Sequence, residues 1–473
     1  MRAQFFNIHH RKTILLLCSI FTGVLIHCTP QDSLQQPNII ILLADDMGYG
    51  DLTCYGGQAV YTPHIDALAA QGMRMTHFYA GSAVCTPSRA ALLTGRHPLR
   101  FDIRQHFTDN EEHLPEGTVT LPKLLKEAGY QTAHIGKWHL GGLREMDFTA
   151  RAQGRPANPG PLQHGFDHSL TSIEGDPPRP ELIKERKLYR EGGKHMVRND
   201  QRAPAIDKFW TDIKVDEAIT LIQAYHKNRQ PFYINLWFDV PHTPYEPAPE
   251  PHLSKYKNMG ATGDQLYFRS MVSNLDAQIG RLVETLKTLD LFDNTLIIFS
   301  SDNGAAWEGD VGPFKGGKTD LHEGGIRVPM FAVWKDRISA NQVSFEDGHM
   351  TDLLPTICQA AGISTDALEL DGLSLLDHLT TGEPVKNRDV LLWQMDLYTH
   401  MQRHYPKPKP YATAIVKKGK WKLLADGDKP VELFDLENDY REMNNLLGHY
   451  PEVEKELLDE LKTFLQEPRK SWK

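Results

Sequence analysis

Short runs of consecutive apolar residues recur along the first 300 positions of the chain. Four of them predict β-strands buried on both faces, because their apolar residues do not alternate with polar ones. These strands span residues 38–44, 132–136, 232–238 and 296–300. Apolar residues at helical spacing lie between them, over 121–128, 212–225 and 265–289. We therefore expect an α/β fold with a large, mainly parallel central sheet flanked by helices.

The pattern changes near residue 385. Beyond it, three short apolar runs separated by glycine turns predict strands at 412–416, 421–425 and 431–434. An amphipathic helix follows and begins at Pro451. We expect a large domain over residues 29–384 and a smaller C-terminal α+β subdomain over residues 385–473.

Residues 1–28 have the pattern of a leader. Basic residues precede an apolar run that is shorter than the 18 or so residues of a membrane-spanning helix, so we expect a cleaved export signal. The end of this run, Leu25 to Cys28, resembles a bacterial lipoprotein box, although His27 stands where a small residue is usual. A lipidated Cys28 and plain secretion both stay open. The expected location is the periplasm or surface of a bacterium, or the medium, and the lipid would be the only membrane contact.

The composition excludes several classes of protein. With 40% hydrophobic and 24% charged residues, the chain is neither disordered nor a polytopic membrane protein. Its formal net charge of −9 argues against nucleic acid as a partner. Removal of the leader makes the chain more acidic still, because residues 1–27 hold basic but no acidic residues. The cysteines are few and scattered, which disfavours a disulfide framework and a cysteine-rich zinc site.

Charged and polar side chains follow the carboxyl end of each strand predicted in the large domain. They are Asp45 and Asp46, then Lys137 and His139, then His242, and finally Asp302 and Asn303. One such ending is most often a polar loop. Ligands of open parallel sheets bind beyond the carboxyl ends of the strands, however, so four such endings predict one shared site.

A further short helix is predicted to begin near Cys85. Pro87 suits its first turn and Gly95 its end. Cys85 would then lie at a helix N-terminus, where free N–H groups attract anions and lower the pKa of a thiol. Taken alone, this cysteine is better explained as a buried structural residue.

The segment CTPSRAALLTGR, from Cys85 to Arg96, resembles the signature of the type I sulfatases, a family of the alkaline phosphatase superfamily. Other motifs resemble the family in the same order along the chain. They are ADDMGYGD at 44–51, GKWHLG at 136–141, PHTP at 241–244, SDNG at 301–304, GK at 317–318 with EGGIRVP at 323–329, DGLSLL at 371–376, GKWKL at 419–423 and ELFDL at 432–436. The resemblance covers essentially the whole chain after the leader.

This resemblance implies a modified residue and a metal ion. Cys85 would be oxidised to formylglycine by a maturation enzyme of the host. The modified residue would bind one Ca²⁺ together with Asp45, Asp46, Asp302 and Asn303. Carboxylate and amide oxygens without histidine or thiolate suit a hard cation of this kind rather than zinc.

The resemblance also implies catalytic roles. The hydrate of formylglycine would attack sulfur, and Lys137 and Lys318 would stabilise the sulfate oxygens. His242, with Lys318, would protonate the leaving alcohol, and His139 would take a proton from the second hydroxyl of the hydrate. Arg89 would hold the hydrate and the metal carboxylates.

The residues that would bind the rest of the substrate have weaker signals in the sequence. Arg100, Arg104 and His106 are candidates for a second anionic subsite, with a solvated surface as the alternative. The insertion over residues 141–202 is rich in proline, glycine and charge, and its basic residues are interleaved with glutamates. That mixture is more typical of a solvated face than of a groove for a polyanion. The export signal and the insertion favour a sulfated carbohydrate as substrate.

Three alternatives to an exported sulfatase stay open. A phosphonate monoester or phosphodiester hydrolase of the same superfamily can use the same signature. A non-catalytic glycan-binding lipoprotein would result if Cys85 is not converted. A thiol hydrolase based on Cys85 and a histidine is the weakest, because it leaves the paired acidic residues unexplained.

Overall fold

The computed structural model describes residues 36–107, 112–172, 196–203, 206–396 and 412–467. The predicted leader with Cys28, and most basic residues of the 141–202 insertion, lie outside these ranges. Within them, no helix combines the length and the apolar character needed to cross a membrane.

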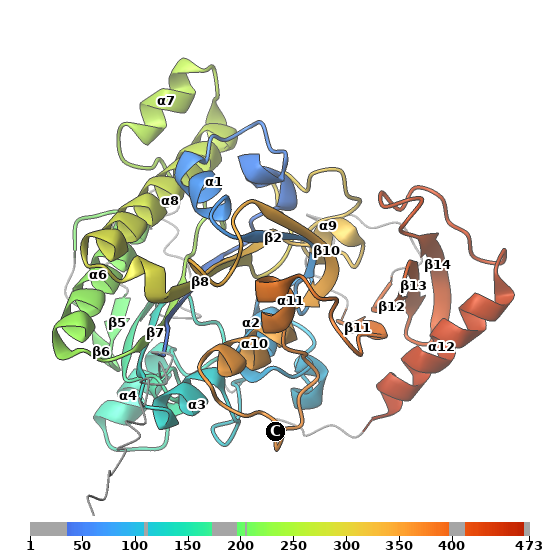
Figure 1. Ribbon diagram of the computed structural model, residues 1–473, viewed down its shortest axis with the longest axis horizontal. Helices are drawn as coiled ribbons and strands as arrows, with labels where there is room; N and C mark the ends of the chain where they lie inside the picture. Colours follow the sequence, from blue (N-terminus) through green and yellow to red (C-terminus); the bar gives the residue numbers. More distant parts are fainter. Residues whose placement is uncertain (1–35, 108–111, 173–195, 204–205, 397–411, 468–473) are drawn as a thin grey trace, which may run out of the picture. The chain divides into compact units, whose positions relative to one another are not determined.

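A ten-stranded sheet forms the centre of the described large domain (Figure 1). Its order is β10-β2-β9-β8-β1-β7-β3-β4-β5-β6. The strands are β1 (Asn38–Ala44), β2 (Met73–Tyr79), β3 (Gln131–Gly136), β4 (His168–Ser172), β5 (Met196–Arg198), β6 (Gln201–Arg202), β7 (Phe232–Trp237), β8 (Thr295–Ser301), β9 (Met330–Val333) and β10 (Gln342–His349). β8, β1, β7, β3 and β4 are parallel, whereas β9 runs antiparallel to both neighbours. The predicted mainly parallel sheet is confirmed.

The central strand β1 shows why these runs are continuously apolar. All its residues are buried. Ile40 and Leu42 pack in the core on one face of the sheet, and Ile39 and Ile41 pack in the core on the other. Each such side chain contributes roughly 1.5–3 kcal/mol when fully buried.

Helices cover both faces of the large sheet and complete the hydrophobic core on each face. One face is covered by α1 (Pro63–Ala69), α6 (Trp210–Asn228), α7 (His252–Asn258) and α8 (Gly263–Thr288). The other is covered by α2 (Cys85–Thr94), α3 (Leu121–Glu127), α4 (Glu145–Ala152), α10 (Leu353–Ala360) and α11 (Leu376–Thr381). The predicted helices at 121–128, 212–225 and 265–289 are thus confirmed with small shifts of their ends.

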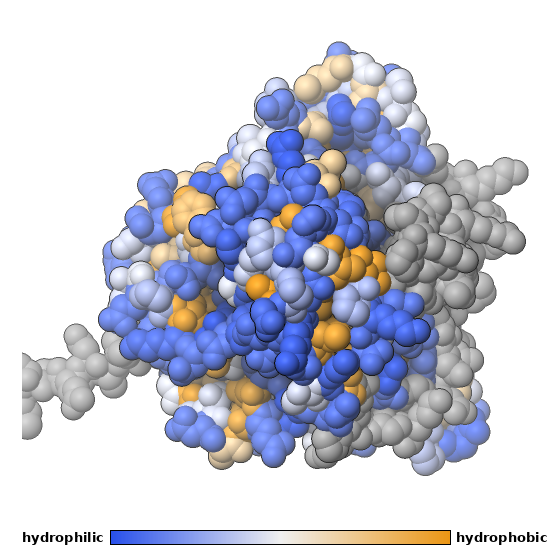
Figure 2. Space-filling model, turned by 90° about the vertical axis from the view of Figure 1, so that its right-hand side faces the viewer, coloured by the Kyte–Doolittle hydropathy of each residue, from blue (hydrophilic) through white to orange (hydrophobic). Residues whose placement is uncertain are grey.

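A four-stranded antiparallel sheet follows near the C-terminus, in the order β11-β12-β13-β14. Its elements are β11 (Val390–Gln394), β12 (Ala414–Lys418), β13 (Trp421–Asp426), β14 (Lys429–Asp435) and the helix α12 (Pro451–Gln466). One face packs on α12, and the other packs on Tyr79 at the end of β2. Figure 2 shows a largely polar surface on this side of the molecule, with small apolar patches. The sequence pattern predicted β12, β13 and β14 but missed β11.

Gly136, at the end of β3, provides a test of this packing. It has φ +114°, and a Cβ there would lie 1.6 Å from the carbonyl oxygen of Trp237. We expect Gly136→Ala to lower the free energy of unfolding by about 3 kcal/mol or more. Gly129→Ala is the control, because Gly129 has φ +90° and a Cβ added there would have no atom within 4 Å. Only the left-handed backbone conformation then opposes alanine, so we expect a loss of about 1–2 kcal/mol. Equal losses in urea unfolding would contradict the expected clash.

Candidate functional site

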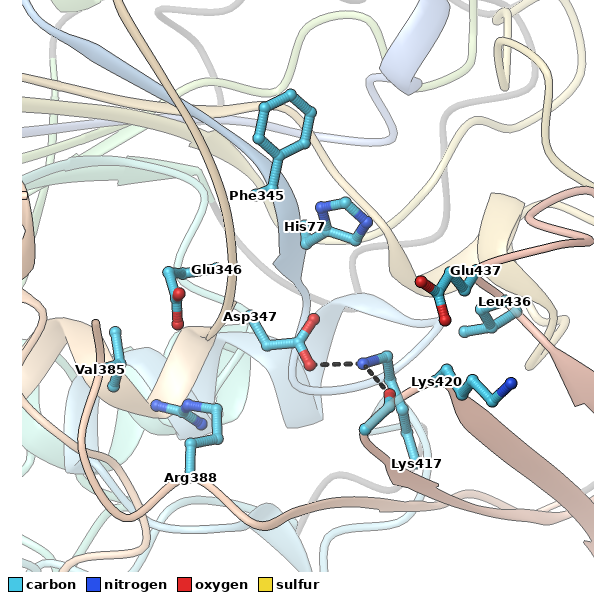
Figure 3. A pocket seen from close by; sticks show the side chains of 11 residues that line it. His77, Phe345, Glu346, Asp347, Val385, Arg388, Lys417, Lys420, Leu436 and Glu437 are labelled. Atoms are coloured by element: carbon cyan, nitrogen blue, oxygen red, sulfur yellow. Dashed lines mark hydrogen bonds and ion pairs between the residues drawn. The ribbon is translucent and has the colours of Figure 1, made fainter. Parts of the chain in front are cut away.

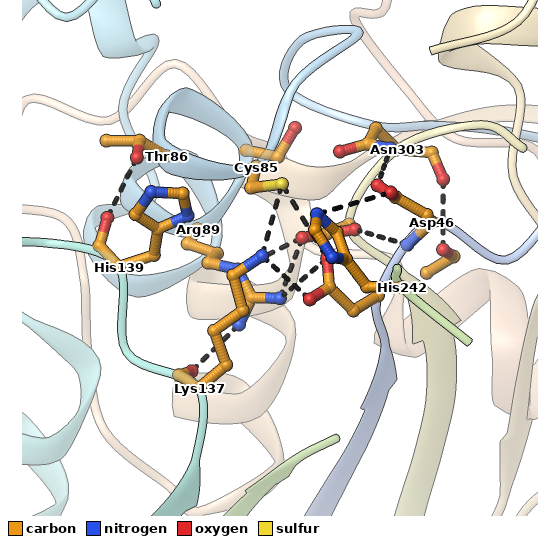
Figure 4. Close-up of polar contacts among 12 residues, drawn as sticks. Asp46, Cys85, Thr86, Arg89, Lys137, His139, His242 and Asn303 are labelled. Carbon is orange, nitrogen blue, oxygen red and sulfur yellow. Dashed lines mark hydrogen bonds and ion pairs between the residues drawn. The ribbon is translucent and has the colours of Figure 1, made fainter. Parts of the chain in front are cut away.

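Three acidic residues and a cysteine meet at the carboxyl edge of the large sheet. Asp45 and Asp46 follow β1, Asp302 follows β8, and Cys85 begins α2. All four are buried, and one donor atom from each lies within 4.8 Å of the others. Figure 4 shows Asp46 and Cys85 of this acidic cluster among the surrounding polar side chains. The predicted convergence of strand ends therefore occurs.

The pairing of β1 with β8 explains the placement of the acids. Ala44 lies opposite Ser301 in the parallel register, so Asp45 and Asp302 leave the sheet side by side. The backbone N–H of Asp46 then donates to Asp302 Oδ1 at 3.2 Å. Asp46 has φ 65°, which is uncommon for a residue other than glycine and costs about 1–3 kcal/mol. This strained turn brings the second carboxylate back toward the first.

Arg89, one turn into α2, is fully buried against these acids. Its Nε and Nη2 donate to Asp302 Oδ2 at 3.0 and 2.7 Å, and its Nη1 donates to the carbonyl of Lys137 at 2.8 Å. The guanidinium also lies 5.2 Å from the ring of Trp237. A buried charge is tolerated only with such partners, so Arg89 both balances and orients Asp302.

Two lysines balance the other carboxylates. Lys137 Nζ lies 2.7 Å from Asp45 Oδ2 and 3.4 Å from Cys85 Sγ. Lys318 Nζ lies 2.8 Å from Asp46 Oδ2. Burial alone would lower the pKa of both amines, but the carboxylates raise it above the usual value. Both lysines are therefore cations at neutral pH.

The carboxylates are ionised for the same reason. Burial raises the pKa of Asp45, but Lys137, His242 and Arg89 bring it down to about 2. Against the same effect of burial, Lys318 and His242 lower the pKa of Asp46. The cluster thus offers several carboxylate oxygens at neutral pH.

Asn303 adds an amide oxygen to this set. Its Nδ2 donates to Asp46 Oδ1 at 2.8 Å and to the carbonyl of Gly304 at 3.0 Å. Its Oδ1 is buried and has no hydrogen-bond partner in the described ranges. Such an orphaned acceptor costs about 1–3 kcal/mol unless something binds it. An oxygen-rich set with one orphaned carbonyl fits a hard divalent cation.

The thiol of Cys85 departs from the prediction. Burial, with the charge of Asp302, raises its pKa to about 12. The expected lowering by the helix N-terminus is wrong, because desolvation and the neighbouring acid outweigh the helix dipole. Since the thiolate is the nucleophilic form of cysteine, this disfavours a thiol hydrolase.

Two histidines flank the cluster, His139 on the side of Thr86 and His242 on the side of Asp46 (Figure 4). His242 Nδ1 donates to the carbonyl of Thr243 at 2.5 Å, and its Nε2 lies 3.5 Å from Asp46 Oδ2. Nε2 is therefore the ring nitrogen that faces the cluster. Burial is the main cause that lowers the pKa of both histidines.

The three predicted subsite residues have different contacts. Arg100 donates to both oxygens of Asp371, at 2.6 and 2.5 Å, and pairs with Glu467 at 3.1 Å. Arg104 pairs with Asp102 at 2.9 Å. The ring of His106 lies 5.9 Å from that of His139. His106 is thus placed beside a site residue, whereas both arginines form ion pairs with carboxylates outside the acidic cluster.

The sequence did not predict the contacts that hold the loop carrying Lys318 against the small sheet. Lys315 Nζ lies 3.2 Å from Glu432 Oε1, and His322 Nε2 lies 2.7 Å from Glu432 Oε2. Glu432 belongs to β14. The small sheet therefore holds this loop on both sides of Lys318. Neither a motif nor a strand-end pattern of the sequence links Glu432 to Lys315 and His322, which lie 117 and 110 positions away.

A second connection is fully buried. Lys422 of β13 lies between two carboxylates, 2.9 Å from Glu323 Oε1 and 2.7 Å from Glu442 Oε1. Glu323 begins the short helix α9 (Glu323–Ile326), directly after the Lys318 loop. Loss of one partner from a buried pair typically costs 3–5 kcal/mol, so this contact fixes the two parts firmly.

Comparison with family models matches residues 37–363 to "Sulfatase" and residues 312–471 to "N-sulphoglucosamine sulphohydrolase, C-terminal". The chain belongs to the sulfatase family. The enzyme is a sulfuric ester hydrolase, as the motifs implied.

Relatives support this assignment. The N-acetylgalactosamine-6-sulfatase of Homo sapiens is 34% identical over 387 residues, which cover 76% of this chain and 69% of that protein. The N-acetylgalactosamine-6-O-sulfatase of Bacteroides thetaiotaomicron is 29% identical over 511 residues, covering 91% and 93%. A crystal structure of Ps i-CgsB in complex with k-i-k-neocarrahexaose has a TM-score of 0.77 at 27% identity, covering 91% and 93%.

The contact between His322 and Glu432 predicts a pH-dependent stability. Burial lowers the pKa of His322, but Asp320 and Glu432 raise it from 6.5 to about 9. The stabilisation is therefore complete below about pH 6.5 and is lost as the pH rises through about 9. From pH 6 to 10, the free energy of unfolding of the sulfatase should fall by about 3 kcal/mol more than that of His322→Asn. If urea unfolding gave the same change of unfolding free energy with pH for the wild type and for His322→Asn, the pair would not be charged.

Proposed function

We propose that this sulfatase removes sulfate from a sulfated carbohydrate, with formylglycine formed from Cys85 and one Ca²⁺. The observation that carries the proposal is the position of Cys85 within a buried set of oxygen donors. Lys137 contacts Cys85 itself, and Lys318 contacts the neighbouring Asp46. A buried structural cysteine has no need of such surroundings.

The metal would be held by Asp45, Asp46, Asp302, Asn303 and the modified residue 85. When bound, Ca²⁺ would supply two positive charges that polarise a sulfate oxygen. Without it, three carboxylates face three cations, Arg89, Lys137 and Lys318, and the charges balance. A divalent cation would therefore make the site positive and release the lysines toward an anionic substrate.

The side chains around residue 85 then have separate tasks. Formylglycine would supply an aldehyde whose hydrate is the nucleophile. Lys137 and Lys318 would stabilise the sulfate oxygens, and Arg89 would keep Asp302 in place. His242 would give a proton to the leaving alcohol through Nε2 from its doubly protonated ring, a form that the charges of Asp46 and Asp45 favour against the effect of burial. His139 would accept a proton from the second hydroxyl of the hydrate.

The names of the relatives support a carbohydrate substrate. Two are named for N-acetylgalactosamine with sulfate at position 6, and Ps i-CgsB was crystallised in complex with k-i-k-neocarrahexaose. Sulfated N-acetylgalactosamine is therefore the first substrate to test. The proposal also includes export of the protein, lipidation of Cys28 and a maturation enzyme of the host. It places the boundary between the catalytic domain and the C-terminal subdomain between residues 384 and 385.

Replacement of the proposed nucleophile gives a direct test. We expect Cys85→Ser to fold normally and to lose multiple-turnover release of sulfate, because serine cannot form the hydrated aldehyde. Cys54→Ser should keep its activity. Mass spectrometry should find the wild-type peptide with residue 85 roughly 18 Da lighter than with cysteine. Full activity of Cys85→Ser would refute the proposal, and faster turnover of phosphonate than of matched sulfate esters would favour the phosphonate hydrolase.

Metal binding can be tested without turnover. After treatment with a chelator, Ca²⁺ should raise the melting temperature, since a ligand at 100 times its Kd adds about 2.7 kcal/mol of stability. Asp46→Asn should lose this shift, whereas Asp428→Asn, at an exposed turn, should keep it. An equal shift in both variants would mean that the ion binds elsewhere.

A further inference from the structure

Apart from the acidic cluster, a hollow lies between the edge of the large sheet and the small sheet (Figure 3). It encloses about 460 Å³, the size of many ligand sites, and sites often form where two packed units meet. Its walls come from β2, β10, the segment before β11, the end of β12 and the turns that follow β12 and β14. None of its lining residues belongs to the acidic cluster.

Three carboxylates and three cations line this hollow, but two of the cations pair with carboxylates that lie outside the lining. Each cation already has a carboxylate partner: Lys417 pairs with Asp347, Arg388 with Asp352 at 2.6 Å, and Lys420 with Asp435 at 2.8 Å. Glu346 and Glu437 have no ion pair in the part of the chain that the structure describes. Burial, with the charge of Arg327, lowers the pKa of His77 to about 4, so this histidine is neutral. With Asp352 and Asp435 counted, five carboxylates and three cations surround the hollow, and this excess of negative charge disfavours a sulfate group there.

The remaining groups suit a polyol with an apolar face. The side chain of Arg388 is only 8% exposed, and its Nε is buried without a hydrogen-bond partner in the described ranges. Glu346 and Glu437 offer acceptor oxygens, and Phe345 leaves 72% of its surface exposed at the rim. A sugar ring has hydroxyl donors for the carboxylates, oxygen acceptors for Arg388 and a C–H face for the aromatic ring.

We propose that this hollow binds an uncharged sugar residue of the polysaccharide whose sulfate esters are hydrolysed at the acidic cluster. The proposal rests on the proposed function, because it assumes a polymeric sugar substrate. Glu346 and Glu437 select against sulfated residues, and Arg388 and Phe345 supply the attraction. The enzyme would then hold its substrate at two places with opposite preferences for charge.

Binding to full-length Cys85→Ser enzyme tests the proposal without turnover. The probes are a neutral tetrasaccharide of galactose and N-acetylgalactosamine and its 6-sulfated form, titrated by calorimetry. A further Phe345→Ala change should weaken binding of the neutral probe about tenfold and leave the sulfated probe unchanged. Tyr61→Ala, which removes an aromatic ring that is 51% exposed elsewhere, should change neither. Glu437→Gln should also weaken binding of the neutral probe.

Other outcomes would overturn the proposal. Unchanged binding of the neutral probe by Phe345→Ala would mean that the hollow holds no sugar. Binding of Ca²⁺ that is lost in Glu437→Gln, without an effect on sugar, would make the hollow a cation site. If the wild type releases sulfate while no neutral sugar binds, only this proposal fails. If the neutral sugar binds at Phe345 but no sulfated glycan is desulfated, the proposed function fails instead.

Discussion

Compensation of buried negative charge is the constraint on which the site depends. Asp45, Asp46 and Asp302 lie out of reach of water, and each has its own cation within 3 Å. Left unpaired, any of these buried carboxylates would cost several kcal/mol of stability. The cations come from α2, from the end of β3 and from the loop before α9, so the three acids are all compensated only when all three segments are in place.

This dependence gives the small C-terminal sheet a part in the site. The loop that carries Lys318 has no long helix or strand of its own and is held by Glu432 and Lys422 across the interface. Because Lys422 is buried between two carboxylates, the interface cannot slide without leaving charges unpaired. The sheet therefore acts on the acidic cluster through Lys318 rather than through its own side chains.

Sequence patterns predicted what depends on local spacing. The apolar runs predict the parallel strands, and the rule for strand ends predicts that Asp45 and Asp302 lie together. The pKa of Cys85 was predicted in the wrong direction, because the depth of burial is a property of the folded chain. The same holds for Arg100, whose partner Asp371 lies 271 positions away. β11 was missed because its short apolar run stands apart from the other strands of its sheet.

The acidic composition and the anionic substrate can be reconciled by the distribution of charge. A chain of net charge −9 repels a sulfated substrate, but salt largely screens that repulsion at distances beyond about 8–10 Å. Inside the acidic cluster, where screening is weak, three cations already balance three acids. A single divalent ion bound there would therefore make the neutral site positive. Attraction is then confined to the place where the sulfate must lie, and the rest of the surface discourages binding in other positions.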